Sequence, residues 1–294
     1  MHVVVLGAGS LGSLVGGLLA RAHEVTLVGR EPHVSRVREG GLELTGAYDE
    51  RVRPDARTDP PASADLAVVT TKAFDTDAAA EALAPVALDA CLSLQNGMGN
   101  ETTLAADLDC PVLAGTCTYG ARLTEPGVVA CTGVGEVVLG ARGGGASEAA
   151  DRVGTAFDAA GLHTTVAEDM PLRLWEKLAV NAGINATTAL ARVENGALLD
   201  GPAGGVARDA ARETARVARA DGLDLDDETA VAAVERVAEA TAANRSSMLQ
   251  DVEAGRRTEV DAISGFVAGY GVETPVNATT ARLVRAWEAA RDLR

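Results

Sequence analysis

The sequence predicts an α/β domain with a parallel sheet, followed by a second domain made only of helices. Within the first 30 residues, a β-branched run, a glycine-rich turn, a helical segment and a second β-branched run follow one another, which is the order of a βαβ unit. From about residue 169, strand patterns largely vanish, and long stretches rich in alanine, arginine and glutamate take their place. A chain of 294 residues suits two domains of ordinary size, which we place at 1–167 and 168–294.

The predicted elements of the first domain alternate between strand and helix. A strand over 2–7 ends in glycine, a helical segment follows over 8–21, and a second strand occupies 24–28. Similar patterns predict three more strands and two more helices, at 66–70, 90–94, 112–116, 75–83 and 101–108. The runs 127–132 and 136–140 are expected to pair as a hairpin, because residues 132–135 are typical of a turn.

The predicted elements of the second domain are all helices. Their compositions place them at 172–191, 203–221, 226–250, 257–269 and 275–293. We therefore expect a fully helical C-terminal domain.

Composition and charge exclude several classes of protein. Apolar residues make up 47% of the chain and charged residues 23%, as in a folded globular protein. With 26 basic and 42 acidic side chains the net charge is −16, so neither nucleic acids nor anionic membrane surfaces are expected partners. The apolar runs are shorter than the roughly 20 residues of a membrane-spanning helix, and no secretory signal precedes the first strand, so we expect a cytoplasmic protein. The cysteines and histidines lack the spacing of a metal site.

The strongest motif is the glycine-rich turn after the first strand. It is a G-x-G-x-x-G motif that opens a helix and consists of Gly7, Ala8, Gly9, Ser10, Leu11 and Gly12. In such a motif the first glycine permits a tight turn, the second lets the backbone approach a pyrophosphate, and the third lets the helix pack closely on the strand. We therefore predict a Rossmann domain that holds the phosphates of a dinucleotide at the helix N-terminus.

Residues after the next strands predict how the nucleotide is recognised. NAD sites usually carry Asp or Glu at the end of the second strand, whereas this chain has Arg30 there. A guanidinium suits a 2′-phosphate, so NADPH is the predicted cofactor. NADH stays open as the alternative, because Glu31 follows directly and because Arg30 could simply be a surface residue. Lys72 and Asn96 follow the carboxyl ends of later strands, where ligands bind in such sheets, and both are expected at the cofactor. Asn96 is also expected near the substrate, although an Asn-Gly pair is typical of a simple turn as well.

Lysine is rare in this chain, which has 24 arginines and only two lysines, Lys72 and Lys177. Burial can lower the pKa of a lysine into the range of a working acid or base, which arginine does not allow, so both lysines are candidates for chemistry. Lys177, Asn181 and Asn185 lie at i, i+4 and i+8 on one side of a predicted helix. The rest of that helix is mostly apolar, so its polar stripe is expected to face either a ligand or a network of hydrogen bonds between helices.

A second set of polar residues lies further along the chain. Asn244, Ser247 and Asp251 have helical spacing, although exposed surface positions are equally open for the first two. Glu259 is expected on the apolar face of the next predicted helix. A carboxylate on such a face needs a partner, and Lys177 is the predicted one.

These residues together resemble the 2-dehydropantoate 2-reductase family, also called ketopantoate reductases. The resemblance covers nearly the whole chain and lies in the segments GAGSLG (7–12), TKAFDT (71–76), LQNGMG (94–99), GTCTYGA (115–121), LWEKLAVNAGINATTAL (174–190), Asn195-Gly196 and SSMLQDVEAGRRTEVDAISGF (246–266). It implies an N-terminal Rossmann domain, a helical C-terminal domain similar to that of 6-phosphogluconate dehydrogenase, and NADPH as reductant. It also implies that Lys177 and Glu259 are catalytic, that Lys72 lies in the cofactor cleft, and that the substrate site consists of Asn96, Asn181, Asn185, Asn195, Asn244 and Ser247.

The reaction implied by this resemblance is the reduction of ketopantoate to pantoate for pantothenate and coenzyme A biosynthesis. A 2-keto acid needs a hydride at carbon, which the nicotinamide supplies, and a proton at oxygen, which Lys177 is expected to donate. Two alternatives stay open: a related 2-keto or 3-hydroxy acid dehydrogenase, and an NADP-binding redox sensor without turnover. The sequence does not decide the oligomeric state, and a homodimer is one option.

Overall fold

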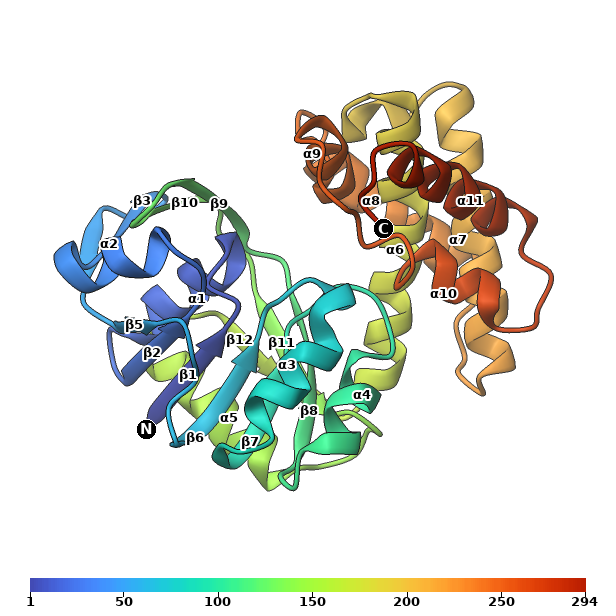
Figure 1. Cartoon of the computed structure of the whole chain (residues 1–294). Coiled ribbons are helices and arrows are strands. Elements are labelled where there is room, and N and C mark those ends of the chain that lie inside the picture. Colours follow the sequence, from blue (N-terminus) through green and yellow to red (C-terminus); the bar gives the residue numbers. More distant parts are fainter. The chain divides into compact units, whose positions relative to one another are not determined.

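The computed structural model describes residues 1–294 and divides into two compact units (Figure 1). The first unit comprises Met1–Gln95 and Gly99–Met170, and the second comprises Asn96–Met98 and Pro171–Arg294. The first is α/β and the second is helical, so the predicted fold class is confirmed. By its contacts, the short segment Asn96–Met98 belongs to the helical unit, although the sequence on either side of it belongs to the first unit.

An eight-stranded sheet forms the centre of the first unit. Its order is β12-β11-β8-β7-β6-β1-β2-β5, and all neighbours are parallel except β11 and β8. The strands are β1 His2–Leu6, β2 Glu24–Val28, β5 Asp55–Arg57, β6 Ser63–Val69, β7 Ala87–Ser93, β8 Val112–Cys117, β11 Val137–Ala141 and β12 Thr164–Val166. From β1 the chain builds the sheet outward on one side through β2 and on the other through β6, so the strand order reverses between β1 and β6. Open α/β sheets bind ligands at such a point, beyond the carboxyl ends of the strands.

Helices cover both faces of this sheet. Alternate residues of β1 belong to two different apolar clusters, one on each face. One cluster includes residues of α1 (Ser10–Leu19), α2 (His33–Gly40) and α5 (Glu148–Ala159), and the other includes residues of α3 (Thr76–Leu83) and α4 (Asn100–Asp107). A strand that is buried on both faces must be apolar throughout, which explains the continuous β-branched run at the start of the sequence.

A second sheet of four strands was not predicted. Its order is β4-β3-β10-β9, and its strands are β3 Leu42–Gly46, β4 Glu50–Val52, β9 Gly120–Glu125 and β10 Val128–Gly133. The hairpin predicted from 127–132 and 136–140 is wrong. β10 pairs with β9 and β3, whereas β11 pairs with β8 and β12 in the large sheet. The residues between β10 and β11 therefore lead from one sheet to the other.

The second unit contains six helices and a short 3₁₀ helix, η2. They are α6 Met170–Ala191, η2 Asn195–Leu198, α7 Pro202–Ala220, α8 Asp227–Ala240, α9 Ser247–Glu253, α10 Ser264–Gly269 and α11 Pro275–Ala289. None of the helices of the chain combines the length and the apolar character that crossing a bilayer requires.

Two predicted helices are shorter in the structure. The helix predicted at 226–250 is interrupted by residues 241–246, which are not helical, and is therefore two helices, α8 and α9. Ser246 is the N-cap of α9, and its Oγ accepts a hydrogen bond from Leu249 N. The helix predicted at 257–269 is confined to α10, so Glu259 lies in a turn ahead of that helix.

Aromatic side chains fix the start of α6 within the helical unit. Trp175 is 1% exposed, and its ring centroid lies 5.9 Å from that of Phe266 and 5.8 Å from that of Tyr270. Its Nε1 donates to Asp221 Oδ2 at 3.0 Å, and the hydroxyl of Tyr270 donates to the same carboxylate. Lys177, two residues after Trp175, is therefore carried by a firmly packed helix.

Candidate functional site

The glycine-rich turn between β1 and α1 is packed too closely for side chains at two of its glycines. Gly7 has a φ of +106°, and a Cβ there would lie 2.7 Å from Thr71 N. A Cβ on Gly12 would lie 2.3 Å from Gly7 O and 2.4 Å from Thr70 Oγ1. Gly7 N also donates to Val28 O at 2.9 Å, which ties the turn to the end of β2. These contacts agree with the roles predicted for the first and third glycines of the motif.

The N-terminus of α1 is able to accept an anion. Its N-cap, Gly9, makes no side-chain capping bond, and the first turn contains no acidic residue. A Cβ on Gly9 would meet only Gly7 O, at 3.9 Å, so this side of the turn faces open space. The side chain of Ser10 accepts a hydrogen bond from Leu123 N at 3.0 Å and is thus tied to β9. The free N–H groups and the dipole at a helix N-terminus favour a negatively charged group.

A buried histidine, His33, packs against α1, the helix that follows the glycine-rich turn. His33 Nε2 lies 2.9 Å from Ser13 Oγ in α1, and His33 Nδ1 accepts a hydrogen bond from Gly127 N at 3.0 Å. Because Nδ1 is an acceptor, the proton of the neutral ring lies on Nε2. Burial lowers the pKa of His33 and so favours this neutral form. Ala8 and Leu11 contact the apolar cluster on this face, so the side chains of the motif support the turn from within.

The charged residues after β2 differ in what they contact. Arg30 is exposed and follows the last residue of β2 by two positions. The carboxylate of Glu31 accepts hydrogen bonds from Ser35 N, at 3.2 Å, and from Ser35 Oγ, within the first turn of α2. The Glu31 carboxylate is therefore bound to the first turn of α2, whereas Arg30, which is exposed like Glu31, lies next to the end of β2.

Buried hydrogen bonds hold the loops that follow β6 and β7. Gln95 Nε2 donates to Thr71 Oγ1 at 3.1 Å and to Thr76 Oγ1 at 2.9 Å. Thr76 Oγ1 in turn lies 2.9 Å from Asn100 Oδ1. Lys72, which is half-buried, lies in the loop between these two threonines, where it is the N-cap of the 3₁₀ helix 73–75. The supporting roles of Gln95, Thr76 and Asn100 were not predicted from the sequence. The polar residues that follow two strand ends were the available signal.

The polar stripe on α6 lies where its helical spacing predicts. Lys177 and Asn181 are half-buried, and Asn185 is 5% exposed. Thr188 continues the stripe, and its Oγ1 lies 2.7 Å from the Oγ of Ser246, the N-cap of α9. The stripe therefore runs along α6 as far as the start of the helix that carries Ser247.

Glu259 is buried, as predicted, and lies beside Asn96. Its side chain is 6% exposed, and Asn96 Nδ2 donates to Glu259 Oε2 at 3.4 Å. The same loop docks through its backbone, because Met98 N donates to Ala262 O at 3.1 Å. Gly97 permits this approach, since its φ is +83° and a Cβ there would lie 2.5 Å from Ala262 O. Two of the predicted site residues, far apart in sequence, are thus brought together in the helical unit.

The remaining predicted substrate residues have different surroundings. Asn195 is buried and donates from Nδ2 to Thr241 Oγ1 at 2.8 Å, while its backbone N donates to Asn244 O at 3.0 Å. Asn244 and Ser247 are both exposed. The helical spacing inferred for these two residues does not hold, because Asn244 lies in the non-helical segment before α9. Their substrate roles stay predictions.

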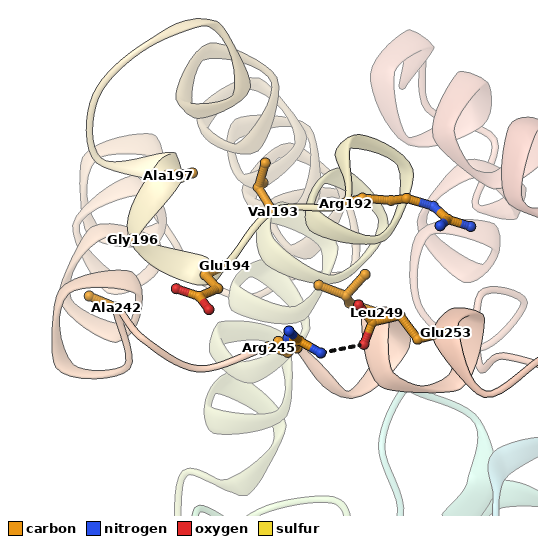
Figure 2. Close-up of a pocket in the computed structure, with 9 residues that line it drawn as sticks. All are labelled: Arg192, Val193, Glu194, Gly196, Ala197, Ala242, Arg245, Leu249 and Glu253. Atoms are coloured by element: carbon orange, nitrogen blue, oxygen red, sulfur yellow. Dashed lines mark hydrogen bonds and ion pairs between the residues drawn. The ribbon is translucent and has the colours of Figure 1, made fainter.

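A surface pocket of about 560 Å³ lies on the helical unit beside η2 and α9 (Figure 2). Arg245 Nη1 lies 3.1 Å from Glu253 Oε2 at its rim. Residues lining the pocket include both neighbours of Asn195, but none of the predicted catalytic or substrate residues. The pocket therefore adjoins the segments of Asn195 and Asn244 but is not lined by the predicted catalytic residues.

Family models match both parts of the chain. The model described as "Ketopantoate reductase PanE/ApbA" matches residues 3–144, and the model described as "Ketopantoate reductase PanE/ApbA C terminal" matches residues 169–288. Among curated relatives, the 2-dehydropantoate 2-reductase of Halobacterium salinarum is 45% identical over 97% of this chain and 98% of its own. That of Archaeoglobus fulgidus is 40% identical over 98% of both chains.

Solved structures are similar over the same length. A PanE/ApbA family ketopantoate reductase from Ralstonia eutropha JMP134 has a TM-score of 0.91 and 34% identity, and covers 99% of this chain and 100% of its own. A D-mandelate dehydrogenase, solved in a ternary structure with NADH and anilino(oxo)acetate, has a TM-score of 0.92 and 25% identity over 100% of both chains. The similarity therefore includes both compact units.

Proposed function

The chain belongs to the ketopantoate reductase family, and we propose that it reduces 2-dehydropantoate to pantoate with NADPH, for pantothenate and coenzyme A biosynthesis. The observation that carries this proposal is the full-length match to relatives named 2-dehydropantoate 2-reductase, at 45% and 40% identity. The buried pair of Asn96 and Glu259 supports it, because these two residues have roles in the site that the family resemblance implies.

The nucleotide site proposed for residues 1–167 fits a dinucleotide. The open space at Gly9 and the uncapped N-terminus of α1 suit a pyrophosphate. Lys72 and Asn96, on loops after the carboxyl ends of β6 and β7, are proposed to contact the bound nucleotide. A nicotinamide dinucleotide agrees with the NADH bound in the D-mandelate dehydrogenase structure. When bound, the cofactor supplies a hydride to the ketone carbon.

NADPH is proposed over NADH because of the charges after β2. Arg30 offers an exposed guanidinium for a 2′-phosphate. Glu31, the residue that kept NADH open, directs its carboxylate to Ser35. Glu31 therefore does not offer a free carboxylate to a ribose 2′-hydroxyl.

Lys177 is proposed to protonate the ketone oxygen. Its place on the packed, largely apolar helix α6 limits its contact with water, and an ammonium group in such a setting both stabilises a developing alkoxide and can donate a proton. Glu259 is proposed to orient this ammonium and the substrate hydroxyl. Asn181, Asn185 and Ser247 are proposed to bind the carboxylate and the distal hydroxyl of the substrate, together with Asn195 and Asn244.

The experiment that tests this function measures loss of NADPH absorbance with ketopantoate for the wild type and two variants. Lys177→Ala is expected to lower kcat by about 10² or more, because both the proton donor and its charge are lost, while NADPH still binds. Lys177→Arg keeps the charge without a useful proton and is expected to lie between. Near-normal turnover in Lys177→Ala would reject the role, and NADPH binding without any consumption by the wild type would favour the redox sensor.

A second candidate substrate follows from the D-mandelate dehydrogenase structure, which has nearly the same fold at 25% identity. An enzyme of that kind would reduce an aromatic 2-keto acid. The polar stripe of Lys177, Asn181 and Asn185 suits the hydroxylated ketopantoate better than an aryl ring. Comparing kcat/KM for ketopantoate and phenylglyoxylate decides between them. The homodimer and the cytoplasmic location stay predictions, and sedimentation would test the first.

A further inference from the structure

The turn that carries Glu259 is anchored to α11 by a fully buried carboxylate. Glu288, at 0% exposure, accepts two hydrogen bonds at Oε1 from Thr258, the residue before Glu259. The donors are Thr258 N, at 2.8 Å, and Thr258 Oγ1, at 2.6 Å. A carboxylate without exposure is costly unless its oxygens are bonded, so this arrangement strongly favours one position of the turn.

The other end of the turn is anchored by arginines. Asp261 accepts hydrogen bonds from Arg285 Nε, at 2.8 Å, and from Arg294 Nη2, at 2.7 Å. Arg294 Nη1 also donates to Glu288 Oε2 at 2.7 Å. One guanidinium therefore joins Asp261, at one end of the turn, to Glu288, the carboxylate that binds the other end. Burial raises the pKa of Asp261, but the hydrogen bonds and charges of Arg285 and Arg294 outweigh this effect and hold that pKa below its usual value.

The anchored turn determines the places of two site residues. It carries Glu259 itself, and its Ala262 O receives Met98 N from the loop that contains Asn96. Asn96 then donates to Glu259 at 3.4 Å. A shift of the turn would therefore displace both Glu259 and Asn96, and displacement of a reacting group by about 1 Å can cost 10²-fold in rate.

We propose that Glu288 is a positioning residue of the reductase, which acts through Thr258 to fix the turn that carries Glu259 and receives the Asn96 loop. This inference rests on the proposed function, because it requires Glu259 to take part in the reaction. The side-chain hydrogen bonds given above all connect Glu288 either to the turn or to an arginine that binds the turn.

A matched control is available at the opposite end of α11. Glu213 is 4% exposed, and its carboxylate accepts hydrogen bonds from Val276 N at 2.8 Å and from Asn277 N at 2.9 Å. Glu213 thus holds the first turn of the same helix in the same unit, and its hydrogen bonds are to Val276 and Asn277 rather than to the Glu259 turn or the Asn96 loop. Both glutamates are buried acceptors for α11 packing, and only Glu288 is expected to affect turnover.

The test compares Glu288→Gln, Glu213→Gln, Glu259→Gln and the double variant Glu288→Gln/Glu259→Gln in the full chain. For each, the denaturation midpoint, kcat, and KM for ketopantoate and NADPH are measured on folded protein. Glu288→Gln is expected to lower kcat about tenfold or more and to leave KM for NADPH unchanged, whereas Glu213→Gln keeps kcat. In the Glu259→Gln background, Glu288→Gln is expected to add no more than about a twofold loss, because both act through one group.

Each outcome bears on the proposal. It is overturned if Glu288→Gln keeps kcat, or if its loss multiplies in full with that of Glu259→Gln. If Glu259→Gln itself keeps kcat, the proposed role of Glu259 fails, and the inference fails with it for that separate reason. Should Glu288→Gln not fold, two variants of Thr258 replace it. Thr258→Val removes the side-chain donor to Glu288 and is expected to lower kcat, whereas Thr258→Ser keeps that donor and is expected to keep kcat. Equal kcat in both variants would overturn the proposal.

Discussion

Two glycines of the turn after β1 predict opposite consequences of the same substitution. In Gly9→Ala, the new Cβ would meet only Gly7 O at 3.9 Å, and the backbone, at φ −86° and ψ −154°, is accessible to alanine. Alanine at a permissive glycine position stabilises by about 0.4–1 kcal/mol, so the nucleotide-free chain should be at least as stable as the wild type. In Gly12→Ala, the Cβ would lie 2.3 Å from Gly7 O, and such overpacking costs about 1–3 kcal/mol.

Binding of NADPH should separate the two variants further. If the pyrophosphate approaches Gly9, the added methyl group occupies its place, and we expect Kd for NADPH to rise about tenfold or more in Gly9→Ala. NADPH at 100 times the wild-type Kd adds about 2.7 kcal/mol to the unfolding free energy, and a tenfold weaker Kd leaves about 1.4 kcal/mol. Without nucleotide, Gly9→Ala should therefore have an unfolding free energy like that of the wild type. On adding NADPH, that free energy should increase less than in the wild type.

The assay is denaturant unfolding of the nucleotide-free chain with and without NADPH, together with a direct NADPH titration. Gly12→Ala serves as the comparison, because its loss of stability should appear without any nucleotide. Wild-type NADPH affinity in Gly9→Ala would show that the backbone at this glycine does not contact the phosphates. Undiminished stability in Gly12→Ala would refute the packing argument for the turn.

Three further perturbations test other parts of the structure. Arg30→Ala should raise KM for NADPH and change KM for NADH much less, as measured by steady-state kinetics with both nucleotides. An equal change in the two KM values would show that Arg30 does not recognise the 2′-phosphate. The pKa of His33 is lowered in the folded chain, so as the pH falls the unfolded chain is protonated at this residue before the folded chain is. The stability that neutral His33 contributes should therefore be complete above about pH 6.5, the ordinary pKa of histidine. Below that pH the unfolding free energy should decline by at most about 1.4 kcal/mol per pH unit. The difference in unfolding free energy between the wild type and His33→Gln across pH 5–7 measures that decline, and a difference independent of pH would contradict it. Trp175→Ala should lower the unfolding free energy by about 3–5 kcal/mol, and Trp175→Phe by less, in denaturant melts; equal losses would show that ring size is not what α6 requires.

Local patterns in the sequence were sufficient for the central strands and for the close packing of the glycine-rich turn. The strand predicted at 24–28 has those bounds in the structure, and the one predicted at 2–7 ends one residue earlier. Strands buried on both faces are continuous apolar runs, and a glycine that is tightly enclosed is visible in its motif. Both signals are local, which is why they could be recognised without the fold.

Pairings between distant segments could not be predicted in the same way. β10 pairs with β3, more than 80 positions earlier, so no turn signal beside β10 could assign it to the right sheet. The turn before α10 depends similarly on Glu288, some 30 positions after Thr258. Burial of Glu259 was predicted correctly from a helical spacing that does not exist. The break before α9 did have a local signal, because Ser246 is a good N-cap residue ahead of an apolar run.

The loop of residues 96–98 has a consequence for dividing the chain. Cleavage after Met170 would not release the two units as separate fragments, since this loop would remain on the first fragment while its acceptor, Ala262 O, would be on the second. The helical fragment alone would lack residues 96–98, so Ala262 O would lose the hydrogen bond from Met98 N and Glu259 would lose the one from Asn96 Nδ2. Reassembly of two such fragments would therefore depend on a tripeptide that packs with the helical fragment but belongs to the chain of the other.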